Sequence, residues 1–345
     1  MKITVVIPTY NTGHRLYDLF DSIRAQTLGF ENIEVIFVDD NSSDDLTLDI
    51  LDKLNTFDNV SVVKLKENSG FPGRGRNIGL GMAQGEFVIF SDHDDTYNED
   101  AFEKMYEEMV FNDSDMVVAN FNQVNKGKIN HFNSGIKERI TIESFKDDLD
   151  IFQIPAAIWT RMFRKEFLTS NDIFFLEGML CEDVYVATLA NFKAKNIVYL
   201  PNTYAYNYSI RDSEGDRSTI HLRNRKYIEA ILDGYFEICK WLDENYPEYG
   251  KNIFKKHLTS WIYTIVLSEI SDEDRFELFK RAQIIFKKYY REDPYFKGKY
   301  NKLVKYILNG DFDQAVAESR EIAKNQDNMN HRKGLFKRIK NKFSR

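Results

Sequence analysis

Two aspartates separated by one residue, Asp92 and Asp94, follow an apolar run and are the first candidates for chemistry in this sequence. Carboxylates held this close together are costly unless a cation compensates their charge. Carboxylate oxygens suit Mg²⁺ and Mn²⁺, and these ions keep positions open for substrate phosphates. The pair therefore predicts a Mg²⁺ or Mn²⁺ site that stabilises charge on a leaving diphosphate. The alternative is a helix N-terminus enriched in acids, which favour the helix dipole.

The same segment also fits a different catalytic motif. In the order Asp92-His93-Asp94-Asp95-Thr96 it matches the DxDxT pattern of phosphatases whose first aspartate attacks phosphorus. That motif normally ends the first strand of its fold, whereas here it follows the fourth strand-like run. We interpret His93, in the variable position, as a bystander. The phosphatase hypothesis leaves the polar segments described next without a role.

Other polar segments also follow strand-like runs. Pro8-Thr9-Tyr10 follows the first run, and Asp39-Asp40 follows the second. An acidic side chain at such a strand end can accept hydrogen bonds from a base N–H or from ribose hydroxyls. We therefore expect Asp40 to contact a nucleoside. The same acids are also compatible with a helix start, which we expect Ser42 or Ser43 to cap.

The segment after the third run, Gly70–Arg76, combines three glycines with one proline and two arginines. Glycine lets the backbone approach a ligand closely, and the Arg76 guanidinium is a fork-shaped donor suited to phosphate oxygens. The sequence predicts a diphosphate-binding turn that leads into a helix over Asn77–Gln84. Taken alone this motif is weak, because most such segments are simply turns.

The elements that would position these residues alternate between strand and helix. Residues 14–26 and 99–111 show the apolar spacing of helices with one buried face. This alternation predicts a parallel sheet with right-handed crossovers, in which ligands bind beyond the carboxyl ends of the strands. Residues 120–215 are harder to interpret, with an apolar stretch over 154–163, and residues 220–325 are expected to be helical. The predicted strands cover residues 3–7, 35–38, 60–65, 87–90, 116–119 and 197–200.

Four segments together resemble the family 2 glycosyltransferases. They are VVIPTYN (5–11), VDDNSSD (38–44), ENSGFPGRGRN (67–77) and FSDHDD (90–95). Their order and spacing are far more specific than any single motif, and the resemblance covers roughly residues 1–215. It implies an α/β domain of GT-A type, with a Rossmann-like mixed sheet flanked by helices, over residues 1–215. A helical region over 216–325 and a basic amphipathic tail over 326–345 would follow.

The resemblance also implies roles for individual residues. A UDP-sugar donor would be bound at one site, with Asp94 as the metal ligand and Asp92 near the ribose or the metal. Asn68 and Arg76 would bracket the nucleotide or the donor sugar. The residues that would hold the uracil and ribose are Pro8, Thr9, Tyr10 and Asp40.

By the same resemblance, Asp183 would be the general base and Glu182 its acidic neighbour. Asp183 would take the proton from an acceptor hydroxyl, so that one displacement inverts the anomeric centre. From the residues alone, an ordinary helix start is the favoured interpretation of this carboxylate pair. Arg211 and Arg217 flank an acidic segment that is either a lid over the diphosphate or a solvated loop.

The ENSGxPGxxRN stretch is similar to bacterial enzymes that glycosylate wall teichoic acid, and related stretches occur in enzymes of capsule and exopolysaccharide synthesis. The resemblance therefore favours N-acetylglucosamine or another hexose as the sugar, and a cell-surface glycan, lipid-linked glycan or polyol-phosphate polymer as the acceptor. A catalytically retired glycan-binding protein is the alternative that is not an enzyme.

Charge and composition limit the partners. The net charge is −7, yet residues 331–345 carry seven Lys or Arg, so the rest of the chain is strongly acidic and nucleic acid is not expected as a partner. Leu335, Phe336, Ile339 and Phe343 share one face of this tail, which favours a helix on the inner leaflet of a membrane. With only two cysteines and no signal peptide or membrane span, we expect a cytoplasmic protein that is peripheral on the membrane. The helical C-terminal region is an expected place for homo-oligomer contacts.

Overall fold

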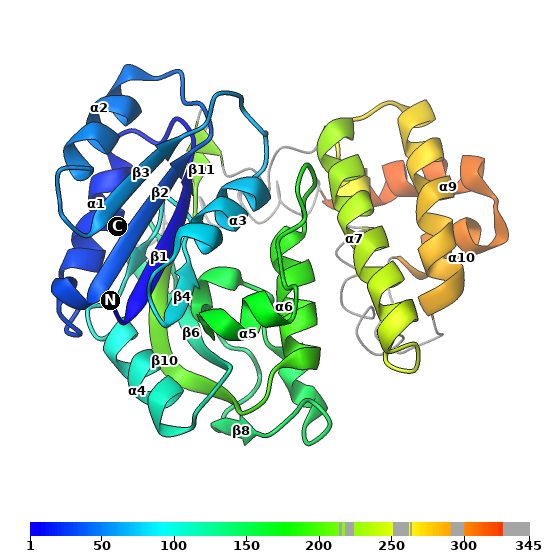
Figure 1. Cartoon of the computed structure of the whole chain (residues 1–345). Coiled ribbons are helices and arrows are strands. Elements are labelled where there is room, and N and C mark those ends of the chain that lie inside the picture. Colours follow the sequence, from blue (N-terminus) through cyan, green and yellow to red (C-terminus); the bar gives the residue numbers. More distant parts are fainter. Residues whose placement is uncertain (214–215, 218–223, 251–261, 263, 291–299, 327–345) are drawn as a thin grey trace, which may run out of the picture. The chain divides into compact units, whose positions relative to one another are not determined.

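The structure is a computed structural model that describes residues 1–213, 216–217, 224–250, 262, 264–290 and 300–326 (Figure 1). Contacts between Cα atoms divide the chain into two compact units, Met1–Ser218 and Thr219–Arg345. The first unit contains a large mixed sheet with helices, and the helices described in the second unit form a separate assembly. The basic tail predicted over 326–345 lies outside the described residues, apart from Gln326.

The sheet of the first unit has ten strands in the order β3-β2-β1-β4-β9-β6-β10-β5, with β7 paired to β6 and β8 paired to β10. Strand β1 runs parallel to both β2 and β4, as the alternation of strands and helices predicts. The ten strands are β1 (Ile3–Thr9), β2 (Ile33–Asp39), β3 (Val60–Lys64), β4 (Phe87–Phe90), β5 (Thr96–Tyr97), β6 (Met116–Asn125), β7 (Lys128–His131), β8 (Ile140–Ile142), β9 (Arg161–Arg164) and β10 (Ile197–Ser209). A short separate pair is formed by β11 (Asp212–Ser213) and β12 (Asp216–Arg217).

Helices cover both faces of the sheet. Side chains alternate between the two faces along a strand, so Val5 and Val6 of β1 point in opposite directions. Val5 belongs to the main apolar cluster with Leu16 and Leu19 of α1, whereas Val6 lies against α3. Figure 1 shows α3 and the pair α1 and α2 on opposite sides of β1–β3. The helices and 3-10 turns of this unit are α1 (Arg15–Arg24), η1 (Phe30–Asn32), α2 (Asp45–Leu54), α3 (Gly73–Met82), α4 (Ala101–Phe111), η2 (Leu149–Gln153), η3 (Ile158–Thr160), α5 (Lys165–Ser170) and α6 (Glu182–Lys193).

Helix α3 begins four residues before the predicted start at Asn77, so the predicted turn over Gly70–Arg76 is wrong in its second half. The glycines there allow a helix to pack tightly on a strand. A Cβ at Gly79 would lie 2.2 Å from Cγ1 of Val6, and one at Gly75 would lie 3.1 Å from Cβ of Pro8. Only glycine lets α3 approach β1 this closely, and this approach places Arg76 at the edge of the sheet.

The cap of α2 also differs from the prediction. Asp44 caps the helix, and its side chain accepts hydrogen bonds from the backbone N–H groups of Leu46 and Thr47. The Ser42 hydroxyl instead donates a hydrogen bond to the Asp39 carboxylate at 2.5 Å and accepts one from the backbone N–H of Asn11. The serine is therefore used to fasten the turn after β2 to the turn after β1.

Strand β9 is not foreseen by the apolar stretch over 154–163. It lies antiparallel between β4 and β6 and makes the sheet mixed. The sequence gives no strand signal here, because β9 begins and ends with an arginine, Arg161 and Arg164, and only Met162 and Phe163 are apolar. The preceding turn η3 packs against α6, β4, β6 and β10.

The second unit confirms the predicted helical C-terminal region for the residues that are described. Its helices are α7 (Arg225–Asn245), α9 (Asp272–Tyr289), α10 (Asn301–Asn309) and a helical segment over 312–326. Each buries one apolar face, for example Leu278, Phe279 and Phe286 on α9. Among the helices that are described, none is both long and apolar enough to cross a membrane.

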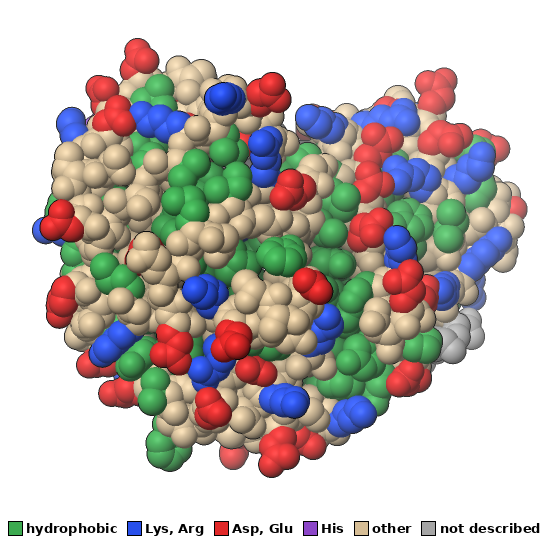
Figure 2. All heavy atoms as spheres, in the orientation of Figure 1, with side chains coloured by type: hydrophobic (Ala, Val, Ile, Leu, Met, Phe, Trp, Pro, Cys, Tyr) green, Lys and Arg blue, Asp and Glu red, His purple; other side chains and the backbone are tan. Residues whose placement is uncertain are grey.

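On the face seen in Figure 2, acidic and basic side chains are interspersed. No continuous basic surface, of the kind that contacts a nucleic acid backbone, is seen on this face among the described residues.

Candidate active site

The polar segments predicted from the sequence lie at one edge of the sheet. Because β1, β2 and β4 are parallel and adjacent, their carboxyl ends meet there, with Thr9 opposite Asp39 and Val6 opposite Phe90. The segments that follow these strands therefore converge. The structure brings together at this edge the residues Pro8, Thr9, Tyr10, Asp40, Arg76, Asp92 and Asp94.

Asp40 fastens the turn that contains Asn68. Its carboxylate accepts the backbone N–H of Ser69 at 2.9 Å and of Gly70 at 3.1 Å. The Asn68 amide donates to the carbonyl of Asp40 at 2.9 Å. Asn68 and Asp40 are therefore held together, and Tyr10, 45% exposed, is the aromatic side chain open to a ligand at this edge.

Pro8 and Thr9 lie beneath this surface. Both are buried, and the Thr9 hydroxyl has no hydrogen-bond partner among the described residues. His93 Nδ1 lies 3.1 Å from the carbonyl oxygen of Pro8. That contact ties the turn after β4 to the end of β1, so His93 has a structural contact rather than no role.

Arg76 joins two distant acidic segments. Its guanidinium is 3% exposed, with Nη1 2.6 Å from Oε1 of Glu182 and Nη2 2.7 Å from Oδ1 of Asp92. Its face lies over the Phe175 ring, 5.3 Å from the centroid. Burial alone would lower the pKa of Arg76, but the charges of Asp92 and Glu182 raise it. Arg76 is thus a permanent cation fixed between two carboxylates.

Glu182 and Asp183 form the first turn of α6, directly after Cys181, whose φ of 64° lies in the left-handed region. Burial raises the pKa of Glu182 to about 7, although Arg76 opposes this rise. Burial also raises the pKa of Asp183, again opposed by Arg76. A carboxylate with a raised pKa beside a polar edge is suited to general-base chemistry, and the helix dipole favours its charged form.

The second aspartate of the acidic motif has a different partner. Asp94 forms an ion pair with Arg211, a predicted lid residue just after β10. Its neighbour Asp95 is buried, accepts hydrogen bonds from the hydroxyl of Tyr206 at 3.0 Å and the backbone N–H of Ser209 at 2.7 Å, and has a pKa raised to about 8 by burial and by Asp94. The backbone of Arg217 lies in β12, and its side chain is outside the described part of the chain.

A divalent cation is compatible with this donor set. Within the described residues, no three His, Cys, Asp or Glu side chains are grouped so that they alone could hold a metal ion. Asp92 and Asp94 supply two hard oxygen donors, and Mg²⁺ or Mn²⁺ commonly takes its other ligands from phosphates and water. Asp92 is already paired with Arg76 and Asp94 with Arg211, so a metal ion here would share both carboxylates with these guanidinium groups.

The comparison with protein families decides the class of this domain. The profile described as Glycosyl transferase family 2 matches residues 4–168, which include the four motifs and the edge where they meet. The chain carries a family 2 glycosyltransferase domain. The DxDxT phosphatase hypothesis is not favoured, because the acidic motif follows β4 and its first aspartate is held by Arg76.

Several curated relatives are about three tenths identical to this chain over the stretches that align. TarS of Staphylococcus aureus, a poly(ribitol-phosphate) β-N-acetylglucosaminyltransferase, is 28% identical over 67% of this chain and 39% of its own length. A poly(ribitol-phosphate) β-glucosyltransferase of Bacillus spizizenii is 32% identical over 68% of this chain and 36% of its own. TarP of S. aureus, another poly(ribitol-phosphate) β-N-acetylglucosaminyltransferase, is 29% identical over 76% of this chain and 78% of its own length. The chain thus spans under two fifths of the first two relatives and most of the third.

The fold agrees with a solved structure. The crystal structure of S. aureus TarS 1-349 in complex with UDP-GlcNAc superposes with a TM-score of 0.73 at 24% identity, covering 94% of this chain and 92% of that one. This match confirms the predicted GT-A fold with its helical C-terminal region.

Two residues at the site were missed by the sequence analysis. The Asn77 amide donates to the carbonyl of Phe175 and accepts its backbone N–H, at 2.9 and 2.8 Å, and so fastens α3 to the segment before α6. Asn77 stands beside Arg76 in the motif, which is the signal that could have found it. Arg161 is completely buried near Asp183, and a single arginine in an apolar stretch gives no local signal.

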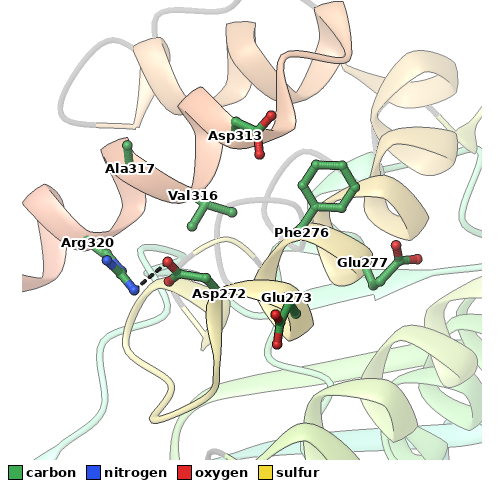
Figure 3. Close-up of a pocket in the computed structure, with 8 residues that line it drawn as sticks. All are labelled: Asp272, Glu273, Phe276, Glu277, Asp313, Val316, Ala317 and Arg320. Atoms are coloured by element: carbon green, nitrogen blue, oxygen red, sulfur yellow. Dashed lines mark ion pairs between the residues drawn. The ribbon is translucent and has the colours of Figure 1, made fainter.

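A separate hollow of about 350 Å³ lies within the helical unit (Figure 3). Arg320 forms an ion pair with Asp272 at one side of it, and Phe276 and Val316 give it an apolar floor. No residue of this hollow belongs to a motif of the glycosyltransferase domain. Its lining residues are Asp272, Glu273, Phe276, Glu277, Asp313, Val316, Ala317 and Arg320.

Proposed function

We propose that the chain is a metal-dependent, inverting glycosyltransferase that moves a sugar from a UDP-sugar to a hydroxyl of a bacterial cell-surface glycan or polyol-phosphate polymer. The observation that carries this proposal is the Arg76 bridge, which joins Asp92 of the acidic motif to Glu182 beside Asp183. Through this bridge, Asp92, which we propose to bind the donor, is linked to the helix turn that carries Asp183, the proposed base.

Donor recognition would follow from groups already placed there. Tyr10 offers an exposed ring on which a base can stack, and Asp40, at the adjacent strand end, offers acceptor oxygens to the nucleoside. TarS is described as a complex with UDP-GlcNAc, and the B. spizizenii relative is a glucosyltransferase. We propose a UDP-hexose donor, with N-acetylglucosamine favoured.

The chemical step is a single displacement at the anomeric carbon. Asp183 accepts the proton of the acceptor hydroxyl while the hydroxyl oxygen attacks the anomeric carbon. The bond from that carbon to UDP breaks on the opposite face of the sugar. Burial favours proton uptake by Asp183, since it raises its pKa. Arg211 pairs with Asp94 of the acidic motif, and we propose that it donates to the departing diphosphate. A Mg²⁺ or Mn²⁺ ion held by Asp94 and Asp92 would neutralise charge on that diphosphate.

The acceptor is proposed from the relatives and from the sequence of the tail. The relatives named here all glycosylate poly(ribitol phosphate). The seven basic residues of 331–345 could contact either anionic lipid at the inner leaflet or a polyanionic acceptor. These residues lie outside the described structure, and the helical unit remains the proposed place for homo-oligomer contacts.

The test is release of UDP from UDP-GlcNAc and UDP-glucose, with and without poly(ribitol phosphate), in Mn²⁺ or in chelator. We expect acceptor-stimulated release that is lost in chelator and falls by a factor of about 100 or more in Asp183→Asn. Asp45→Asn, an exposed aspartate in the first turn of α2, is the matched control and should retain activity.

Two outcomes would contradict the proposal. UDP binding without turnover in any condition would favour the retired glycan-binding protein. Hydrolysis of simple phosphoesters without a nucleotide sugar, lost in Asp92→Asn, would favour the phosphatase.

A further inference from the structure

Arg161, at the start of β9, is a charged side chain that is completely buried. It is 0% exposed and is among the largest fully buried side chains of the described chain. Its Nη1 donates to the carbonyl of Pro155 at 3.1 Å and lies 3.5 Å from that of Ala157. Its Nε and Nη2 have no hydrogen-bond partner among the described residues. A buried guanidinium without a bonded carboxylate is costly, so its retention needs a reason.

The position of Arg161 points to the candidate active site. Strand β9 pairs with β4, with Met162 opposite Ile89, so Arg161 lies at the end of β4 from which Asp92 follows. Turn η3, directly before Arg161, packs against α6, the helix that begins with Glu182 and Asp183. Burial lowers the pKa of Arg161 to about 10, and the charge of Asp183 opposes this fall.

The nearby cation Arg76 already pairs with two carboxylates other than Asp183. Arg76, on α3, is shared between Asp92 and Glu182 at 2.7 and 2.6 Å. These two carboxylates alone exceed its single positive charge, and Asp183, which is partly buried, adds a third carboxylate to the same cluster. Arg161 is a second, fully buried cation near this cluster, and the nearby charges that favour its charged form are those of Asp183 and Tyr199.

We propose that Arg161 is a positioning residue that acts through Asp183, by holding the Asp183 carboxylate charged and oriented at its partly buried position. This inference rests on the proposed function, in which Asp183 takes the acceptor proton. Burial raises the pKa of Asp183, and a base must still be ionised to accept a proton. A second guanidinium limits that rise and so keeps the base available near neutral pH.

A double-mutant cycle tests the coupling without any assay of activity. The unfolding free energies of Arg161→Met, Asp183→Asn and the double variant are compared with the native chain in urea. If Arg161 acts through Asp183, the destabilisation caused by Arg161→Met becomes smaller in the Asp183→Asn background, because no buried anion is left unpaired. Additive effects of the two changes would overturn the proposal. Arg164→Met, at the other end of β9 and paired with the exposed Glu86 and Asp113, should add without coupling.

The pH profile of UDP-sugar turnover tests the consequence for the base. The acid limb of kcat/KM should move up by roughly one unit in Arg161→Met and stay close to the native limb in Arg161→Lys, which keeps the charge. An unmoved limb in Arg161→Met would overturn the proposal. If Arg161→Met does not fold, Arg161→Gln replaces it in the cycle, where coupling to Asp183→Asn supports the proposal and additive effects overturn it. A native chain without turnover would refute the proposed function, and the cycle would still decide the role of Arg161.

Discussion

Arg76 and Glu182, separated by 106 positions in the sequence, form an ion pair with Nη1 2.6 Å from Oε1 and both side chains buried. This pair locks the first turn of α3 against the first turn of α6. Helix α3 carries part of the motif that follows β3, and helix α6 carries the candidate base. The ion pair therefore fixes the positions of these two parts of the proposed site relative to each other.

Removing one partner of this pair should be strongly destabilising. Arg76→Met leaves Glu182 and Asp92 without their cation in a buried site, and we expect a loss of about 3–5 kcal/mol in unfolding free energy. Arg74→Met, an exposed arginine on the same helix, should change stability by less than about 0.5 kcal/mol. Urea unfolding of both variants measures the difference. Equal, small losses would show that the bridge does not hold the site.

The packing of α3 on β1 predicts opposite effects of alanine at two glycines of one helix. At Gly79 a Cβ would lie 2.2 Å from Val6, so Gly79→Ala should cost about 1–3 kcal/mol through overpacking. At Gly81 a Cβ meets nothing within 4 Å, so Gly81→Ala should stabilise the helix by up to about 1 kcal/mol. Thermal unfolding of the two variants checks the signs, and a stabilising Gly79→Ala would refute the close approach of α3.

The turn held by Asp40 predicts a specific loss of nucleotide affinity. Asp40→Asn replaces a charged acceptor of the Ser69 and Gly70 N–H groups with a weaker one. We expect UDP binding to weaken by roughly tenfold, since both the turn and its nucleoside contacts are loosened. Calorimetric titration measures this, with Asp45→Asn as the control. Native affinity in Asp40→Asn would remove Asp40 from the site.

Asp95 predicts a pH dependence of stability. Its pKa is raised from 3.8 to about 8 by burial and by Asp94, so the folded chain holds its proton more tightly than the unfolded chain. The stability that this proton gives is complete below about pH 4 and is lost as the pH rises through about 8. Asp95→Asn keeps a neutral side chain at every pH, so its stability relative to the native chain should rise from about pH 4 to about pH 8. A constant difference in melting temperature over that range would contradict the raised pKa.

Much of the sheet could be predicted because its strands are continuous apolar runs. Each ends in polar residues, as Val38 is followed by Asp39 and Asp40, and parallel strands bring such ends together without further information. The start of α3 was misplaced because three glycines favour a turn in isolation. In the folded chain their lack of a Cβ lets the helix contact β1, and that tertiary gain outweighs the local preference.

The sequence does not show which side chains from distant segments contact each other. Nothing local to Arg76 states that its partner is Glu182, and both its guanidinium chemistry and the resemblance assigned Arg76 to the donor. Arg161 was missed for the same reason, since a lone arginine among apolar residues has no period that marks it. Asp44, rather than Ser42 or Ser43, caps α2 because Ser42 is already bonded to Asp39 across the turn.

The most direct measurement of the central claim is a calorimetric titration of UDP, with ADP for comparison, into the native chain and Asp40→Ala in the presence of Mn²⁺. A nucleotide site at the carboxyl ends of β1, β2 and β4 predicts one saturable UDP site per chain, discrimination against ADP, and loss of binding in Asp40→Ala. Absence of UDP binding by the folded native chain, or equal binding by Asp40→Ala, would contradict the account.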